Sequence, residues 1–289
     1  MEQASNTRDF SSVSPSARWM MLWKGYTGIP YAREVAELLE YPNPYNPDFS
    51  KRDYTFWAST LGLESRYLSI DQLLNELDIP NILELSAGFS FRSLDYVRHK
   101  GVHYIDTDLP EVIATKKEFL LRLQKDTITN GKLELLPLDA LDEASFLEIV
   151  RNFPAGKVVV ANEGLLGYLK PLEKEKLCTT IHTVLKVRGG YWITGDIFLN
   201  HKNRRLGLQY NDEISKFNEQ QQTDLNNFES FTDAQKFFNR MGFVVDKEAK
   251  IKYSEMSAFP YLKKSMTLRD FVRIKFSGRI QATWRLRAV

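Results

Sequence analysis

Acidic residues follow three short apolar segments of this sequence. Asp106-Thr107-Asp108 comes after one segment, Asp139-Ala140 after a second and Asn162-Glu163 after a third. A carboxylate at the end of a parallel strand can accept hydrogen bonds from the hydroxyls of a ribose or from the amino group of an adenine. Each acid also fits a helix cap or a solvated turn. The convergence of all three favours a binding site for a nucleoside.

A turn of small residues follows the first apolar segment of this region. Glu84-Leu85-Ser86-Ala87-Gly88 passes directly into a helical pattern. Small side chains let a ligand lie against the backbone, and a helix N-terminus offers free N–H groups. The turn lacks the three glycines of the dinucleotide fingerprint, and the sequence has no lysine-bearing phosphate loop. It therefore favours a nucleoside with little or no phosphate over NAD or FAD, although a turn that serves packing alone would also be small.

Alternating strand and helix patterns carry these residues. We predict strands for five short apolar runs, at residues 81–85, 102–106, 133–138, 157–161 and 190–198, with amphipathic helical segments between them. Two further runs, at 243–245 and 280–289, complete a sheet of seven strands. This alternation predicts an α/β fold, with a doubly wound, mostly parallel sheet and helices on both faces.

The two ends of this pattern suggest a division of the chain. Residues 1–78 read as helices interrupted by a proline and asparagine cluster at 41–47, so we expect a helical N-terminal cap segment there. Residues 79–289 would form the main domain. Residues 199–231 are polar and follow the carboxyl end of the fifth strand, where open α/β sheets bind ligands. A lid and a plain surface excursion both fit this segment.

Composition restricts the partners. The sequence has 39 Lys and Arg against 37 Asp and Glu, a net charge of +2 that gives no field for gathering nucleic acid or an anionic membrane. Its single cysteine, Cys178, is expected to be a buried spectator, and its four histidines lack a zinc-site spacing, so we expect no metal. No apolar run is long enough for a bilayer, and residues 1–16 lack a signal-peptide core. We therefore expect a cytoplasmic protein that acts on a small molecule.

Three stretches of the sequence, residues 82–92, 104–116 and 160–169, resemble the leucine carboxyl methyltransferase family. They contain its D-x-P element, Asp108-Leu109-Pro110, and its E-G element with a following Tyr-Leu pair, which begins at Glu163-Gly164. The resemblance extends over residues 16–198. It implies the class I S-adenosylmethionine-dependent methyltransferase fold, with S-adenosylmethionine as the cofactor and S-adenosylhomocysteine as the product.

The resemblance also implies a role for each matching residue. Gly88 and its neighbours would contact the methionine part of the cofactor, Asp108 the ribose and Asp139 the adenine. Glu163 would lie near the methionine ammonium, and Arg66 would reach the methionine carboxylate. The complete set expected at the cofactor is Lys24, Arg66, Glu84, Ser86, Gly88, Asp106, Asp108, Asp139, Ala140 and Glu163.

This chain departs from the family pattern at two positions. The family usually has G-x-G where Ser86-Ala87-Gly88 stands, and an aspartate where Ser90 stands. Ser86 adds a hydroxymethyl group beside the expected cofactor, where it can weaken binding or form a hydrogen bond. Arg92 is retained and can also serve to tie the first helix to the sheet.

Three residues are candidates for the transfer step. His201 is the histidine placed to deprotonate a hydroxyl acceptor, whereas a carboxylate acceptor is ionised at pH 7 and needs no base. Arg204 lies in a basic run that can clamp an anionic substrate, and Tyr168 can touch the acceptor or the sulfonium. A solvated loop, for His201 and Arg204, and ordinary packing, for Tyr168, are the alternatives.

We therefore expect an O-methyltransferase that acts on a carboxylate or hydroxyl of a small, anionic organic molecule. One alternative keeps the chemistry but takes the C-terminal carboxylate of a protein as the acceptor. The other is a non-catalytic nucleoside-binding scaffold of the same fold, which the serines at positions 86 and 90 would support.

Overall fold

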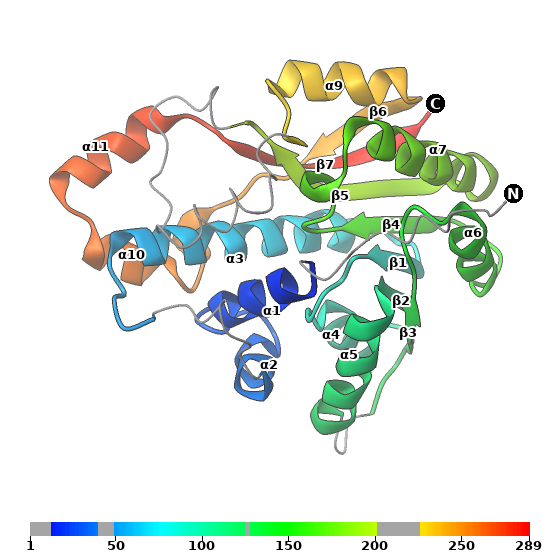
Figure 1. The fold of residues 1–289 in the computed structure, drawn as a ribbon, viewed down its shortest axis with the longest axis horizontal. Coiled ribbons are helices and arrows are strands. Elements are labelled where there is room, and N and C mark those ends of the chain that lie inside the picture. Colours follow the sequence, from blue (N-terminus) through cyan, green and yellow to red (C-terminus); the bar gives the residue numbers. More distant parts are fainter. Residues whose placement is uncertain (1–12, 40–48, 125–127, 201–225) are drawn as a thin grey trace, which may run out of the picture.

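A computed structural model of the protein describes residues 13–39, 49–124, 128–200 and 226–289. Its centre is a seven-stranded sheet in the order β3-β2-β1-β4-β5-β7-β6 (Figure 1). The strands are β1 (Asn81–Leu85), β2 (His103–Asp108), β3 (Lys132–Pro137), β4 (Val158–Asn162), β5 (Gly190–Phe198), β6 (Phe243–Glu248) and β7 (Gln281–Ala288). The first five strands are parallel, and β7 is antiparallel to both of its neighbours. The predicted fold class is confirmed.

Helices cover both faces of the sheet. One face packs against α6 (Glu143–Arg151), α7 (Pro171–Arg188) and α9 (Phe231–Arg240), and the other against α3 (Tyr54–Asn75), α4 (Arg92–His99) and α5 (Pro110–Leu123). Every residue of the central strands β1 and β4 is buried, because both of their faces are covered. This explains why the two strands are mostly apolar rather than alternating, although Asn81 and Glu84 of β1 and Asn162 of β4 are buried polar residues.

The register of the parallel strands places the acids of the sequence at one edge. Glu84 of β1 is paired with Asp106 of β2, and Leu85 is paired with Asn162 of β4. The residues that follow these strands therefore leave the sheet on the same side and at nearly the same level. This alignment brings together the three polar segments identified in the sequence.

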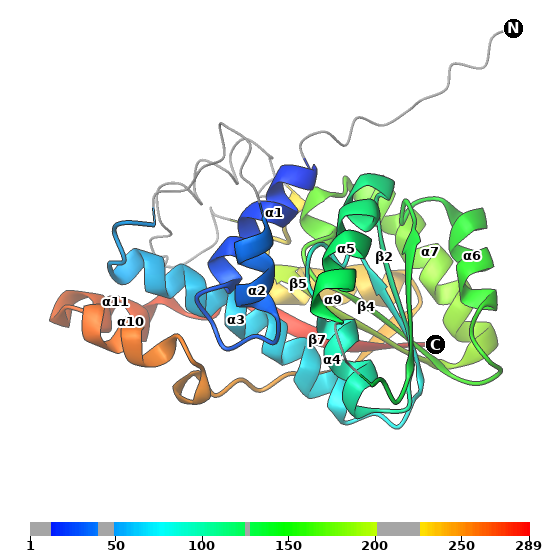
Figure 2. The same ribbon diagram turned by 90° about the horizontal axis from the view of Figure 1, so that it is seen from below.

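The N-terminal helix α1 (Val13–Lys24) packs against α3 at this same edge, and α2 (Ala32–Leu38) packs against α1 and α5 (Figure 1; a second view is given in Figure 2). The regular apolar spacing of α3 starts only at Ile70, but the helix begins at Tyr54, where Asp53 accepts hydrogen bonds from the first free N–H groups. The earlier turns are buried on several sides and carry buried polar residues such as Glu64 and Arg66. They therefore show no simple apolar stripe.

Two short helices between β6 and β7 were not predicted: α10 (Phe259–Ser265) and α11 (Leu268–Ser277). The Glu64 carboxylate of α3 accepts hydrogen bonds from Ser257 and Ala258 at the start of α10, and Trp57 stacks on Tyr261 with 4.5 Å between ring centroids. The α10 helix is thus held by α3, which lies far from it in the sequence.

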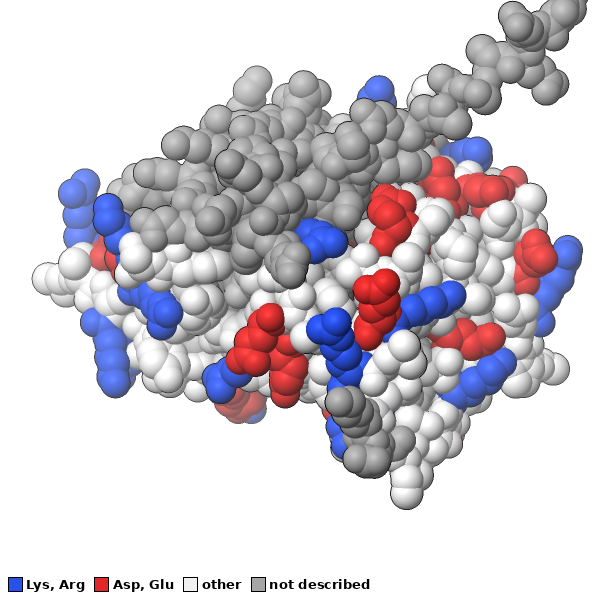
Figure 3. Space-filling model, turned by 60° about the horizontal axis from the view of Figure 1, so that its bottom comes forward, with Lys and Arg blue, Asp and Glu red and all other residues white. Residues whose placement is uncertain are grey.

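The charged side chains on the described surface are mixed, as the balanced composition of the sequence predicts. On the face shown in Figure 3, basic and acidic side chains are interspersed. None of the described helices combines the length and the apolar character that crossing a bilayer requires. Cys178 is buried and unpaired, as expected.

Candidate functional site

A cavity of about 250 Å³ lies at the carboxyl ends of β1, β2 and β4. Most of the predicted residues line it, namely Lys24, Arg66, Glu84, Ser86, Gly88, Asp108, Asp139, Ala140, Glu163 and Tyr168. Sequence analysis missed the wall formed by α1, where Ser16, Ala17, Met20 and Met21 also face the cavity. Nothing in the local pattern of α1 distinguishes this wall from an ordinary apolar helix face.

The first turn of the cavity has an unusual backbone. Ser86 has a φ of 51° and Gly88 a φ of 53°, both in the left-handed region. Glycine adopts this region at no steric cost, whereas serine does so with strain. The strain lies at the position where the family usually has glycine, so Ser86 occupies a backbone conformation that suits glycine better.

Asp108 joins the ends of β1 and β2. Its Oδ2 accepts a hydrogen bond from the Gly88 N–H at 2.7 Å, and its Oδ1 accepts one from the Leu109 N–H at 2.8 Å. Burial raises the pKa of Asp108, and the two backbone hydrogen bonds and nearby Lys116 act in the opposite direction. The carboxylate is therefore fixed in orientation and retains lone pairs that can accept hydrogen bonds from hydroxyl groups.

Asp106 does not line the cavity, although sequence analysis placed it beside Asp108. Its Oδ2 lies 2.5 Å from the Ser93 Oγ of α4 and 2.7 Å from the Lys116 Nζ of α5. Both Asp106 and Lys116 are fully buried. This pair connects β2 to the two helices below the cavity, so its role is structural.

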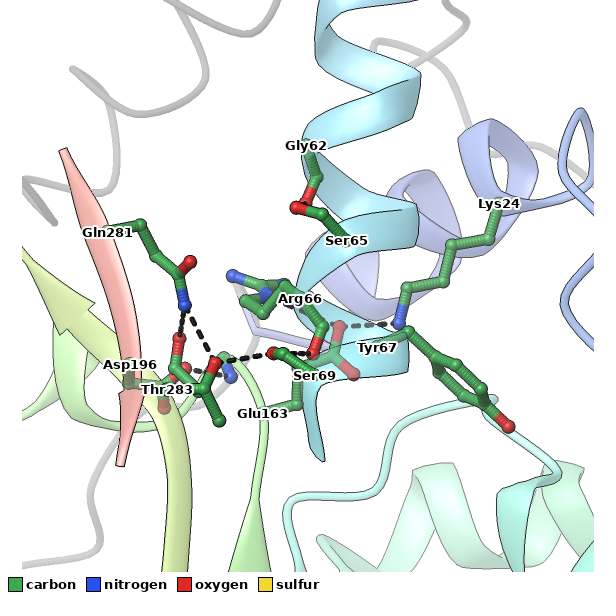
Figure 4. A network of polar contacts seen from close by, with 12 residues as sticks. Lys24, Gly62, Ser65, Arg66, Tyr67, Ser69, Glu163, Asp196, Gln281 and Thr283 are labelled. Atoms are coloured by element: carbon green, nitrogen blue, oxygen red, sulfur yellow. Dashed lines mark hydrogen bonds and ion pairs between the residues drawn. The ribbon is translucent and has the colours of Figure 1, made fainter. Parts of the chain in front are cut away.

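Glu163 is the charged centre of the cavity (Figure 4). Its Oε1 accepts hydrogen bonds from the Lys24 Nζ at 2.6 Å and from the Arg66 Nε at 3.2 Å. Its Oε2 accepts one from the Arg92 Nη2 at 3.0 Å. Burial would raise the pKa of Glu163, but the three cations outweigh burial and lower it to about 2. For Lys24, burial lowers the pKa, and repulsion from Arg66 and Arg92 lowers it further. The attraction of Glu163 opposes this shift but does not cancel it.

Arg92 is buried and does not reach the cavity. Its guanidinium pairs with Asp71 and with the Glu84 Oε1 at 3.3 Å, and it donates to the Tyr67 carbonyl at 3.0 Å. It thus ties the first helix after β1 to α3 and to the sheet, one of the two roles that sequence analysis allowed. Arg92 also holds the Glu163 Oε2, the carboxylate oxygen that does not contact Lys24.

Tyr168 belongs to the short 3-10 helix Leu166–Tyr168 and faces the cavity. Burial raises its pKa, while a hydrogen bond with Ser16 and the charge of Arg66 act against this rise. His201 and Arg204 lie outside the described residues, as does most of the predicted lid, so their roles stay predictions. The described residues contain no cluster of His, Cys, Asp or Glu side chains that could hold a metal ion.

About half of the sequence, residues 39–182, matches a known family. Residues 39–182 fit the model of the family described as leucine carboxyl methyltransferase. Over these residues, the chain belongs to the leucine carboxyl methyltransferase family. The resemblance inferred from the sequence motifs is thus confirmed, and the chain is a member of a methyltransferase family. Among curated protein sequences, none matches the chain.

A solved structure of another protein supports the architecture. A DUF574 family protein from Streptomyces avermitilis has a TM-score of 0.56 at 12% identity, and the match covers 95% of this chain and 97% of that one. At this identity, the likeness shows the fold alone.

Two other matches are weaker. Magnesium protoporphyrin IX methyltransferase from Synechocystis, solved with bound S-adenosylhomocysteine, has a TM-score of 0.49 at 10% identity, covering 90% of this chain and 94% of that one. The complex of LepI with S-adenosylmethionine has a TM-score of 0.47 at 8% identity, covering 76% of this chain and 46% of that one. The chain therefore spans less than half the length of LepI.

Proposed function

We propose that the protein is an S-adenosylmethionine-dependent O-methyltransferase that acts on a carboxylate or hydroxyl of a small organic molecule, with S-adenosylhomocysteine as the product. One observation carries this proposal. In a chain of a methyltransferase family, a single cavity gathers Asp108, Asp139 and the buried cluster of Glu163 with Lys24 and Arg66.

The chemistry of this donor set fits the cofactor. Asp108 would accept hydrogen bonds from the ribose hydroxyls, and Asp139 with Ala140 would lie along the adenine. Glu163 would hold the methionine ammonium, while Lys24 and Arg66 would hold the methionine carboxylate. Because the amino and carboxylate groups of the methionine part carry one positive and one negative charge, these two groups together leave the net charge of this buried cluster unchanged.

The residues of the chain would act mainly by positioning and by excluding water. When bound, S-adenosylmethionine supplies an electrophilic methyl group, and its transfer is an in-line displacement that depends on alignment. Met20 and Met21 of α1 form an apolar wall that keeps water from the cavity. Tyr168, which also lines the cavity, would contact the acceptor or the sulfonium.

We favour an anionic carboxylate as the acceptor, because such a group is already ionised at pH 7 and needs no general base. The described part of the cavity offers no histidine as a general base, which supports this choice. A protein C-terminal carboxylate stays the alternative acceptor within the same chemistry. We also propose that the reaction takes place in the cytoplasm.

Thermal unfolding tests the cofactor first. The purified protein is heated with S-adenosylmethionine, S-adenosylhomocysteine, NADH or ATP in separate samples. A ligand at about one hundred times its dissociation constant adds roughly 2.7 kcal/mol, which for a chain of this size shifts Tm by several degrees. We expect a shift with the first two ligands only. A shift with NADH alone would contradict the proposal, and no shift with any ligand would favour the non-catalytic scaffold.

The acceptor class is then tested with the methylated product. A methyl ester releases methanol in mild alkali, whereas a methyl ether does not. With radiolabelled S-adenosylmethionine and a panel of small carboxylates and phenols, we expect alkali-labile label. Alkali-stable label on oxygen would move the proposal to a hydroxyl acceptor, and label found only on a protein would favour the protein carboxylate.

A further inference from the structure

Asp196, near the carboxyl end of β5, is a buried acid outside the cavity. It is 4% exposed and does not belong to the cavity wall. Its Oδ1 accepts a hydrogen bond from the Gly164 N–H at 2.7 Å. Its Oδ2 accepts from the Asn162 Nδ2 at 2.6 Å, the Leu165 N–H at 2.7 Å and the Leu166 N–H at 3.1 Å. One carboxylate thus receives four hydrogen bonds from a single stretch of five residues.

This stretch, residues 162–166, is the turn after β4 and includes Glu163. Three successive backbone N–H groups converge on one point in the turn, an arrangement that binds anions in proteins. Gly164 has a φ of 81°, which permits the sharp change of direction. Without the carboxylate, the three backbone N–H groups would lose their partner, which destabilises this conformation of the turn. The turn can therefore take this shape only with an anion beneath it.

Asp196 also acts on residues beyond the backbone of the turn, namely Asn162 and Arg66. Asn162, which donates to Asp196, also accepts a hydrogen bond from the Trp192 Nε1 at 2.7 Å, so its amide is fixed on both sides. The negative charge of Asp196 helps Glu163 to raise the pKa of Arg66 against the effect of burial. Figure 4 shows Asp196 and Glu163 on opposite sides of Arg66, which lies between the two acids.

We infer that Asp196 is a positioning residue of the cofactor site: its carboxylate shapes the turn 162–166 so that Glu163 faces Lys24 and Arg66. This inference rests on the proposed function and goes beyond it, since neither the sequence motifs nor the cavity wall includes Asp196. In this role Asp196 touches no ligand. It acts on the methionine end of the site through Glu163.

The test compares two ligands that differ only at the methionine end. S-adenosylhomocysteine reaches Glu163 under the proposed function, whereas adenosine lacks the amino acid part. Binding of both is measured by calorimetry to the wild type, Asp196→Asn, Glu163→Gln and the double variant. We expect Asp196→Asn to weaken the binding of S-adenosylhomocysteine at least tenfold and to leave the affinity for adenosine within about twofold of the wild type. The double variant should bind S-adenosylhomocysteine no more weakly than Glu163→Gln alone.

Two other outcomes would contradict either the role of Asp196 or the proposed function. Equal weakening of both ligands, or no weakening of S-adenosylhomocysteine, would overturn the role of Asp196, because general loosening of the fold would affect both. Failure of the wild type to bind S-adenosylhomocysteine would overturn the proposed function itself.

If Asp196→Asn does not fold, Asn162→Ala provides a second test. Asn162 donates to the Asp196 Oδ2 at 2.6 Å and does not line the cavity, so this change acts through the contact between Asp196 and the turn. The same selective loss of S-adenosylhomocysteine binding would support the inference. Unchanged binding of both ligands by Asn162→Ala would contradict it.

Discussion

Glu163→Gln removes the negative charge on which Lys24, Arg66 and Arg92 converge. These cations hold the pKa of Glu163 at about 2, against 4.5 for an ordinary glutamate. Each pKa unit is worth about 1.4 kcal/mol, so the ionised form is favoured by about 3 kcal/mol in the folded state. The side chain is only 6% exposed, so water weakens this interaction little. We expect the variant to lose about 3 kcal/mol of unfolding free energy at pH 7.

The pH dependence gives a sharper test than a single value. A carboxyl whose pKa is lowered by folding stabilises the folded state above its unfolded pKa, and this contribution disappears as the pH falls through the folded pKa. For Glu163, the relevant window lies between about pH 4.5 and pH 2. The difference in stability between wild type and Glu163→Gln should therefore be constant from pH 7 to about 5 and shrink below that.

Urea denaturation followed by tryptophan fluorescence, repeated across this pH range, provides the measurement. Glu175→Gln is a matched control, because Glu175 is a surface acid of α7 that pairs with the Arg240 Nη2 at 2.7 Å and lies outside the cavity. We expect it to change stability by less than 1 kcal/mol. A Glu163→Gln protein as stable as the wild type at pH 7, or a difference that persists unchanged to pH 3, would refute the electrostatic reasoning.

Three further predictions concern other parts of the molecule. Asp108→Asn should weaken both adenosine and S-adenosylhomocysteine at least tenfold in calorimetry, because both carry the ribose; unchanged affinity would remove Asp108 from the site. Ser86→Gly should raise the unfolding free energy of the ligand-free protein by up to about 1 kcal/mol by relieving the strained φ of 51°, whereas Ser86→Ala, which keeps the strain, should not. Burial lowers the pKa of Lys174 to about 8, so between pH 8 and 10.5 the stability of the wild type should rise relative to Lys174→Met as the pH increases, and a flat difference in urea titrations would contradict this.

The sequence by itself determined the sheet and the edge at which the site lies. Parallel strands that are covered on both faces are mostly apolar, so β4 and the apolar residues of β1 were visible as short runs. Parallel strands in register end at the same edge, so Asp108 and Glu163 could be assigned to one site although 55 positions separate them in the sequence. Short motifs at these strand ends were sufficient to indicate the family.

Only the tertiary structure decided which charges meet. Asp106 and Asp108 are two positions apart on one strand, yet Asp106 pairs with Lys116 and Asp108 reaches the cavity, because α5 covers the first and the turn at Gly88 approaches the second. Lys24 meets Glu163 across 139 positions of sequence. The partner of a buried charge depends on how distant helices pack, and local residue patterns contain no record of that packing. For the same reason, neither the α1 wall of the cavity nor the hydrogen bonds from the turn after β4 to Asp196 could be predicted from the sequence.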